Sequence, residues 1–126
     1  MSHRFTIAID RLTDEPCAWS NLGYWKQNSG TIQNTCEDSI GACYPNACEQ
    51  LAEWVAQISG ITSGDRILDL CVGAGASVRY WLKKHEASGV DAVELRPESL
   101  AQLAQNPPQR LGHLFTAAIE NPKLLS

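Results

Sequence analysis

The chain has 126 residues, of which 44% are hydrophobic and 19% are charged, and its formal net charge is -4. This is the composition of an ordinary globular domain, and it suggests neither a membrane span nor a fibre. The ten basic residues are scattered rather than gathered into one stripe, which argues against nucleic acid as a partner.

The first predicted segment covers residues 1–44 and is irregular. Apolar periodicity is weak over residues 5–43, and the run KQNSGTIQNT is the most polar of the chain. The opening MSHRFTIAIDRLTDEP has no continuous apolar core and carries acidic residues early, so it is neither a secretory signal nor a transit peptide. These features predict a cytoplasmic protein with a loose N-terminal segment.

The five cysteines are an odd set without a C-x-x-C pair, which is typical of reduced thiols rather than of a disulfide framework. The spacing of Cys36, Cys43 and Cys48 matches no common zinc site. We therefore predict no metal.

The second predicted segment, residues 45–126, alternates helices and strands. A first helix opens at Pro45 and stops at Gly60, and its apolar positions at helical spacing are Ala47, Leu51, Trp54, Val55 and Ile58. The run from Arg66 to Val72 has almost no polar alternation, apart from Asp69, and predicts a strand buried on both faces of a parallel sheet.

A second helix follows Gly75, where the run ASVRYWLKKHE places Val78, Trp81 and Leu82 on one face. Residues 89–95 predict a second strand, and PESLAQLAQ predicts a helix that opens at Pro97 and ends at the NPP of residues 106–108. A poor signal around residues 114–117 suggests a third short strand. This order predicts an α/β fold, a partial Rossmann-like, doubly wound parallel sheet of two or three strands with flanking helices.

The turn after the first strand carries the candidate chemistry. Its residues Gly73, Ala74 and Gly75 leave backbone N–H groups and the positive end of a helix open, and glycine permits a positive φ and close approach of a ligand. The turn suits a negative or polar ligand group, and it equally suits a tight connection without a ligand.

Glu94 favours the ligand site. It lies 19 residues after Gly75, the spacing at which a crossover helix and a strand return the chain to the same sheet edge. A carboxylate at a strand end accepts hydrogen bonds from both hydroxyls of a ribose. The alternative is a solvated carboxylate that caps the next helix.

Asp69 bears on which nucleotide-like ligand fits. A dinucleotide site has the pattern G-x-G-x-x-G, whereas Val78 occupies the third glycine position here, and an acid inside the first strand is unusual for that site. A buried carboxylate needs a partner, either local backbone amides or the ammonium group of a ligand. Binding of a nicotinamide dinucleotide is therefore disfavoured, and it ranks third, behind the two hypotheses given below.

The runs ILDLCVGAGAS and GVDAVELRPESLAQ together resemble the cofactor-binding half of class I S-adenosylmethionine-dependent methyltransferases. The resemblance spans Gly23 to Gln105, and the upstream runs NLGYW and YPNACEQLAEWVAQISGITSGDRILDL are similar to the entry segment of the small-molecule branch of that family. One departure is Cys71, which stands where the family usually has glycine.

The resemblance implies S-adenosyl-L-methionine as the cofactor. The implied cofactor-binding residues are Asp69, Gly73, Ala74, Gly75, Glu94, Leu95, Tyr24 and Trp25. In this assignment Asp69 and the glycines bind the methionine part, Glu94 binds the ribose and Leu95 packs on the adenine. Tyr24 and Trp25 close over the cofactor as an aromatic lid. No catalytic residue is implied.

The family's sheet has about seven strands, of which this sequence accounts for two or three, so we expect a truncated sheet. The expected function is a methyltransferase, or a fragment of one, that transfers a methyl group to a small-molecule acceptor. The alternative is a non-catalytic interaction module whose first strand exposes an edge, so that the module self-associates or needs a partner chain to complete the sheet.

Overall fold

The computed structural model describes residues 19, 21, 23, 24 and 40–120, with side chains from Tyr44 onward in the helix that starts at residue 40. The chain divides into two compact units, Met1–Ile58 and Ser59–Ser126. Within the described residues, no helix combines the length and the apolarity that crossing a lipid bilayer requires.

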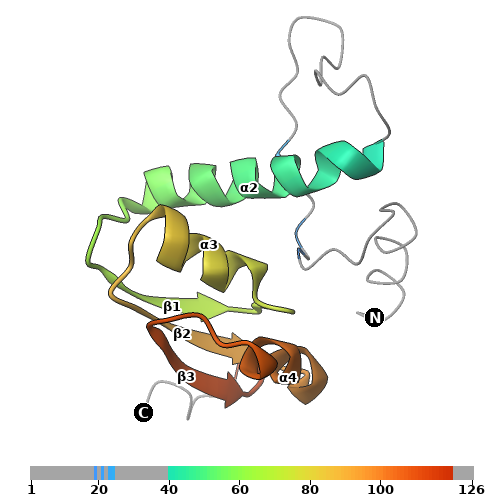
Figure 1. Cartoon of the computed structure of the whole chain (residues 1–126), viewed down its shortest axis with the longest axis vertical. Coiled ribbons are helices and arrows are strands. Elements are labelled where there is room, and N and C mark those ends of the chain that lie inside the picture. The colour runs from blue at the N-terminus through green and yellow to red at the C-terminus, as the bar shows by residue number, and fades with distance from the viewer. Residues whose placement is uncertain (1–18, 20, 22, 25–39, 121–126) are drawn as a thin grey trace, which may run out of the picture. The chain divides into compact units, whose positions relative to one another are not determined.

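Helix α2 (Ile40–Ser59) dominates the first unit (Figure 1). The prediction that the helix opens at Pro45 is wrong, because the helix is already formed before Pro45, which lies inside it. Tyr44 is buried and its hydroxyl donates a hydrogen bond to the carbonyl of Asn21, so tertiary contacts anchor the preceding turn. Such contacts offset the roughly 3 kcal/mol that proline costs in a helix interior. Gly60 follows the helix with a φ of 69°, as its predicted stop.

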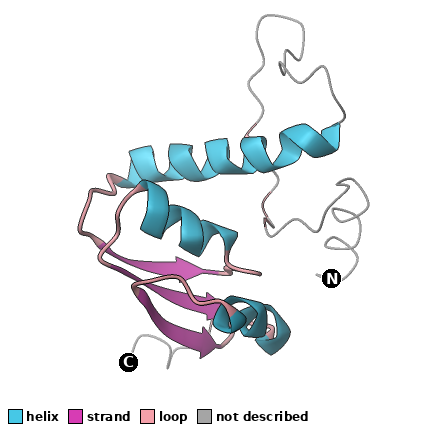
Figure 2. Ribbon diagram, viewed as in Figure 1, coloured by secondary structure: helices cyan, strands magenta, loops and turns pink. Residues whose placement is uncertain are grey.

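The second unit is a parallel sheet with two helices (Figures 1 and 2). In the order β1-β2-β3, its strands are β1 (Arg66–Leu70), β2 (Gly89–Glu94) and β3 (Leu111–Thr116). The connections are α3 (Ala76–Lys84) and α4 (Pro97–Gln105). Helix α3 contacts β1 and β2, and α4 contacts β2 and β3. This arrangement confirms the predicted partial Rossmann-like sheet.

Local sequence signals predicted the helices of this unit closely. Helix α3 begins directly after Gly75, and α4 begins at Pro97. The predicted buried face of α3 is confirmed, with its buried residues Val78, Trp81 and Leu82. The third strand is present, but it begins at Leu111 rather than at residue 114.

Strand β1 does not have the predicted burial on both faces. Leu68 and Leu70 are 45% and 46% exposed, whereas Ile67 and Asp69 are half-buried. Because side chains alternate along a strand and Asp69 bonds to Trp81 of α3, the two leucines face the opposite side of the sheet. Strand β1 is also one of the two edge strands of the sheet that the described residues form. The apolar run therefore indicated a burial that three strands do not provide.

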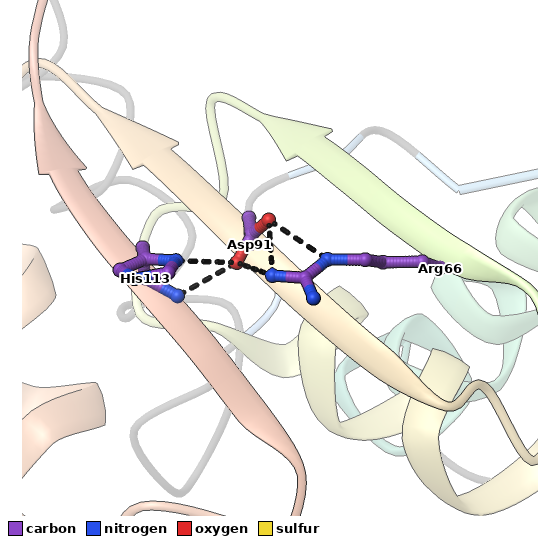
Figure 3. A network of polar contacts seen from close by, with 3 residues as sticks. All are labelled: Arg66, Asp91 and His113. Atoms are coloured by element: carbon purple, nitrogen blue, oxygen red, sulfur yellow. Dashed lines mark hydrogen bonds and ion pairs between the residues drawn. The ribbon is translucent and has the colours of Figure 1, made fainter.

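Asp91 in β2 connects all three strands (Figure 3). Its carboxylate accepts hydrogen bonds from Arg66 Nη2 of β1 at 3.0 and 3.1 Å and from the backbone N–H of His113 of β3 at 2.7 Å. The His113 N–H first, and Arg66 after it, hold the pKa of the Asp91 carboxyl below its usual range. Two residues of β3, Gly112 and His113, oppose the single Asp91, which makes a β-bulge. A Cβ at Gly112 would lie 2.1 Å from Asp91 Oδ1, so the bulge requires glycine there.

Candidate cofactor-binding site

The turn that joins β1 to α3, residues 71–75, has an uncommon backbone conformation. Cys71, Gly73 and Gly75 have φ values of 61°, 56° and 90°, all in the left-handed region. The N–H of Cys71 donates to the carbonyl of Val93 at 2.8 Å, which ties the turn to β2. Gly75 also packs closely, since a Cβ there would lie 2.7 Å from Leu103 Cδ1 in α4. The conformation therefore favours glycine at both positions, and close packing favours it further at Gly75.

The N-terminus of α3 opens onto this turn. Gly75 is its N-cap, and no side chain makes a capping hydrogen bond there. The first N–H groups of a helix have no acceptor within the helix and carry the positive end of its dipole. The turn therefore presents backbone donors of the kind that bind carboxylate or phosphate groups.

Glu94, the last residue of β2, lies directly beside the turn, as its spacing predicted. It is only 8% exposed, and its Oε2 accepts a hydrogen bond from the N–H of Gly73 at 2.8 Å. Its Oε1 accepts from the N–H of Arg96 at 3.1 Å, and the Arg96 Nε lies 3.8 Å from the same oxygen. Glu94 thus joins the glycine turn to the start of α4. The sequence did not predict the part played by Arg96, because backbone donors carry no residue signature.

Asp69 lies on β1 next to the turn and finds its partners within the protein. Trp81 of α3 donates its indole N–H to Asp69 Oδ2 at 2.8 Å, and the Ser77 hydroxyl makes a second hydrogen bond to the carboxyl group. Burial raises the pKa of Asp69, and both hydrogen bonds act against that rise. Trp81 was predicted only as a core residue, although its place on the buried face of α3 was the signal that it reaches β1.

Cys71 is the first residue of the turn. It is exposed, and partial desolvation and then the charges of Glu94, Asp69 and Glu120 raise the pKa of its thiol. This dependence indicates that both predicted acids lie within electrostatic range of the thiol. A raised pKa favours the protonated thiol, which is a weaker nucleophile than the thiolate.

The remaining predicted site residues are less closely assembled. Ala74 is half-buried between the two glycines, and Leu95 is 65% exposed directly after Glu94, with a free apolar surface for a ring. Tyr24 belongs to the first unit, where its ring stacks on Trp54 with centroids 6.0 Å apart. Trp25 lies outside the described residues. The aromatic lid over the turn stays a prediction.

Comparison of the sequence with known proteins identifies one curated relative in particular. The chain is 31% identical over 80 residues to the erythromycin 3''-O-methyltransferase of Saccharopolyspora erythraea. The match covers 64% of this chain and 22% of the relative, so the chain spans about a fifth of that protein's length. No family model matches the sequence.

Solved structures share the fold at low sequence identity. The [4+2]-cyclase SpnF superposes with a TM-score of 0.63 at 15% identity, over 93% of this chain and 41% of SpnF. The mycolic acid cyclopropane synthase CmaA1, solved with SAH and CTAB, superposes with a TM-score of 0.62 at 17% identity, over 91% of this chain and 37% of CmaA1. The predicted resemblance is thereby confirmed in sequence by one methyltransferase and in fold by these solved structures, and it covers only part of the length of each.

Proposed function

We propose that this chain is the cofactor-binding part of an S-adenosylmethionine-dependent methyltransferase with a small-molecule acceptor. The observation that carries the proposal is the 2.8 Å hydrogen bond between the N–H of Gly73 and the carboxylate of Glu94. It brings the glycine turn and the acidic residue within hydrogen-bond distance, which supports a single site for a ligand with a polar amino-acid end and a ribose. The curated methyltransferase relative supports the same reaction class.

The residues of the site fit this cofactor by charge and hydrogen-bonding capacity. The uncapped N-terminus of α3 suits the carboxylate of the methionine part, and Asp69 suits its ammonium group. Glu94 suits the ribose hydroxyls with the lone pairs that Gly73 and Arg96 leave open, and the exposed Leu95 suits a face of the adenine.

The reaction class defines what the protein contributes. When bound, the cofactor supplies a methyl group activated on a positively charged sulfur. The residues of this chain bind and orient it, and such positioning accounts for much of the rate in a group transfer. We assign no catalytic residue within the described part of the chain.

Calorimetric titration of the full chain with S-adenosylmethionine, S-adenosylhomocysteine and NADH tests the cofactor assignment. We expect binding of the two sulfur-containing nucleosides, and weaker binding in Glu94→Ala by about 1–3 kcal/mol because the ribose hydroxyls lose their acceptor. Binding must be expressed per folded molecule, because Glu94 also holds the turn. Preference for NADH, or equal affinities of the wild type and Glu94→Ala, would contradict the assignment.

A second candidate function rests on a different feature, the open edge of the sheet at β1. Among the described strands β1 pairs only with β2, its Leu68 and Leu70 side chains are exposed on one sheet face, and an apolar edge strand is a pairing site for another chain. We propose that a second copy or a partner chain completes the sheet next to β1. Light scattering at increasing concentration should show self-association that Leu68→Lys reduces, whereas the control Ile119→Lys, also at an exposed apolar position, does not. A monodisperse wild type at all concentrations would contradict pairing between copies.

The cytoplasmic location also stays a proposal. Neither Cys48 nor Cys71, the two cysteines whose side chains the structure describes, is part of a disulfide. Reduced thiols are the usual state in the cytoplasm. Counting the free thiols of the chain purified without reductant tests this assignment, and a disulfide formed in the cell would contradict it.

A further inference from the structure

We propose that Trp81 is a positioning residue for the cofactor site, because its indole N–H fixes the orientation of the Asp69 carboxylate toward the ammonium group of the cofactor. The inference rests on the proposed function and adds a residue that the resemblance to the family does not imply. Trp81 touches Asp69 and is assigned no contact with the cofactor. Its effect on binding is therefore indirect.

The indole itself is firmly held. Trp81 is 6% exposed on the inner face of α3. Tyr80 packs edge-on against it with ring centroids 5.5 Å apart, and His85 packs against the indole at 5.8 Å and against Tyr80 at 5.6 Å, so the three rings form one cluster. A donor fixed in this way offers its hydrogen in one direction only, toward Asp69 Oδ2 at 2.8 Å.

The orientation of the Asp69 carboxylate depends on such a donor. The terminal torsion of an aspartate is broad, so the backbone alone does not fix the plane of the carboxylate. A hydrogen bond from Trp81 to one oxygen, with a second from the Ser77 hydroxyl, selects one plane and leaves other lone pairs open. Charge-assisted hydrogen bonds of this kind also favour the ionised carboxylate, which an ammonium ligand requires.

Because Asp69 is half-buried, the hydrogen bond from Trp81 also affects the ionisation of its carboxyl group. The half-buried position of Asp69 raises the pKa of its carboxyl group, and the hydrogen bond from Trp81 opposes the rise. Without the indole N–H, the group would be both less often ionised and less precisely oriented. A phenyl ring at position 81 keeps most of the packing while it removes the donor, so the two contributions are separable.

The test uses the full chain, the variants Trp81→Phe and Asp69→Asn, and their combination. S-adenosylhomocysteine carries the ammonium group, and 5′-methylthioadenosine carries the same nucleoside without it. We expect Trp81→Phe to weaken binding of S-adenosylhomocysteine on the order of five- to tenfold and that of 5′-methylthioadenosine less than about twofold. In the Asp69→Asn background, Trp81→Phe should change neither affinity by more than about twofold, since the group through which it acts is gone.

A second measurement is independent of any ligand. The carbon-13 resonance of the Asp69 carboxyl group should titrate at a higher pH in Trp81→Phe than in the wild type. The control Ser77→Ala removes the other donor and should produce a shift in the same direction. An unchanged Asp69 titration in Trp81→Phe would overturn the proposal.

Equal losses of affinity for the two nucleosides, or the same loss in the Asp69→Asn background, would show that Trp81 acts only through packing and would also overturn the proposal. A wild-type chain that binds neither nucleoside refutes the proposed function, and the role of Trp81 with it. If Trp81→Phe does not fold, 3-benzothienylalanine at position 81 replaces the N–H by sulfur and keeps both rings, and the same outcomes apply.

Discussion

Replacing Glu94 by alanine should destabilise the fold even without a ligand. The change removes the acceptor of the Gly73 N–H, which belongs to a buried residue, and the acceptor of the partly buried Arg96 N–H. Hydrogen bonds to a charged group contribute about 1.5–3 kcal/mol each when their loss leaves a buried partner unsatisfied. Water reaches Arg96 more easily, so its N–H adds about 0.5–1 kcal/mol.

The expected loss is therefore about 2–4 kcal/mol in the free energy of unfolding, a large part of the roughly 5–15 kcal/mol that a domain has. Urea denaturation followed by circular dichroism measures it. With a dependence of about 2 kcal/mol per molar urea, the middle of the range for a small protein, the midpoint should fall by about 1–2 M.

Two further variants make the measurement specific. Glu94→Gln keeps one acceptor oxygen but turns an amide NH₂ toward the other backbone donor, so its loss should be intermediate. Glu98→Ala removes an exposed carboxylate from the first turn of α4 and should cost no more than about 1 kcal/mol. If Glu94→Ala unfolds within 0.5 kcal/mol of the wild type, on the order of the change at an ordinary surface site, Glu94 does not hold the turn.

Three other substitutions give distinct expectations. In urea denaturation, Cys71→Gly should be more stable than Cys71→Ala by about 0.5–1 kcal/mol. Glycine avoids the roughly 1–2 kcal/mol cost of a Cβ at a φ of 61°, but the greater conformational entropy of its unfolded chain cancels part of this gain. A lower stability of the glycine variant would contradict the assigned conformation. The pKa of Asp91 is lowered by folding, so the stability that this group contributes is present above its unfolded pKa of about 3.9 and is lost as pH falls through the folded value. In Asp91→Asn, the free energy of unfolding should therefore fall less steeply at acidic pH than in the wild type. An unchanged fall at acidic pH would refute this expectation. The pKa of Asp69 is raised by folding, so the stability that this group contributes below its unfolded pKa is lost as pH rises through the folded value. At pH 7, Asp69→Asn should therefore be no less stable than the wild type, with an unchanged far-ultraviolet circular dichroism spectrum and weaker cofactor binding. Unfolding of this variant with normal binding per folded molecule would favour a structural role.

Features encoded by neighbouring residues were predictable from the sequence. The start of α3 after Gly75 and the start of α4 at Pro97 follow from the backbone preferences of single residues, and the proximity of Glu94 to the turn follows from the length of one crossover. The early start of α2 was not predictable, because Tyr44 anchors it through a contact distant in sequence.

The errors in β1 and β3 have different causes, and both lie in the tertiary structure. The apolar run in β1 shows that its side chains suit an interior, but not whether a second layer is there to cover Leu68 and Leu70. In β3, Gly112 and His113 interrupt the apolar pattern because they form the bulge opposite Asp91, so the strand appeared to start later. The partners of Asp69 were missed for the same reason as α2, since Trp81 reaches the carboxylate only in the folded chain.

The bulge in β3 has a consequence for how sequences with this fold diverge. Gly112 has no room for a Cβ chiefly because the Asp91 carboxylate occupies that space, and the carboxylate is held there by Arg66 and the His113 N–H. Positions 91 and 112 are therefore expected to covary. A homologue with a side chain at position 112 should lack an acidic residue at position 91. Arginine at position 66 would then have no carboxylate partner at position 91. A single substitution at position 112 would then persist in a lineage only after position 91 had already changed, which sets the order in which these neighbouring strands can accumulate mutations.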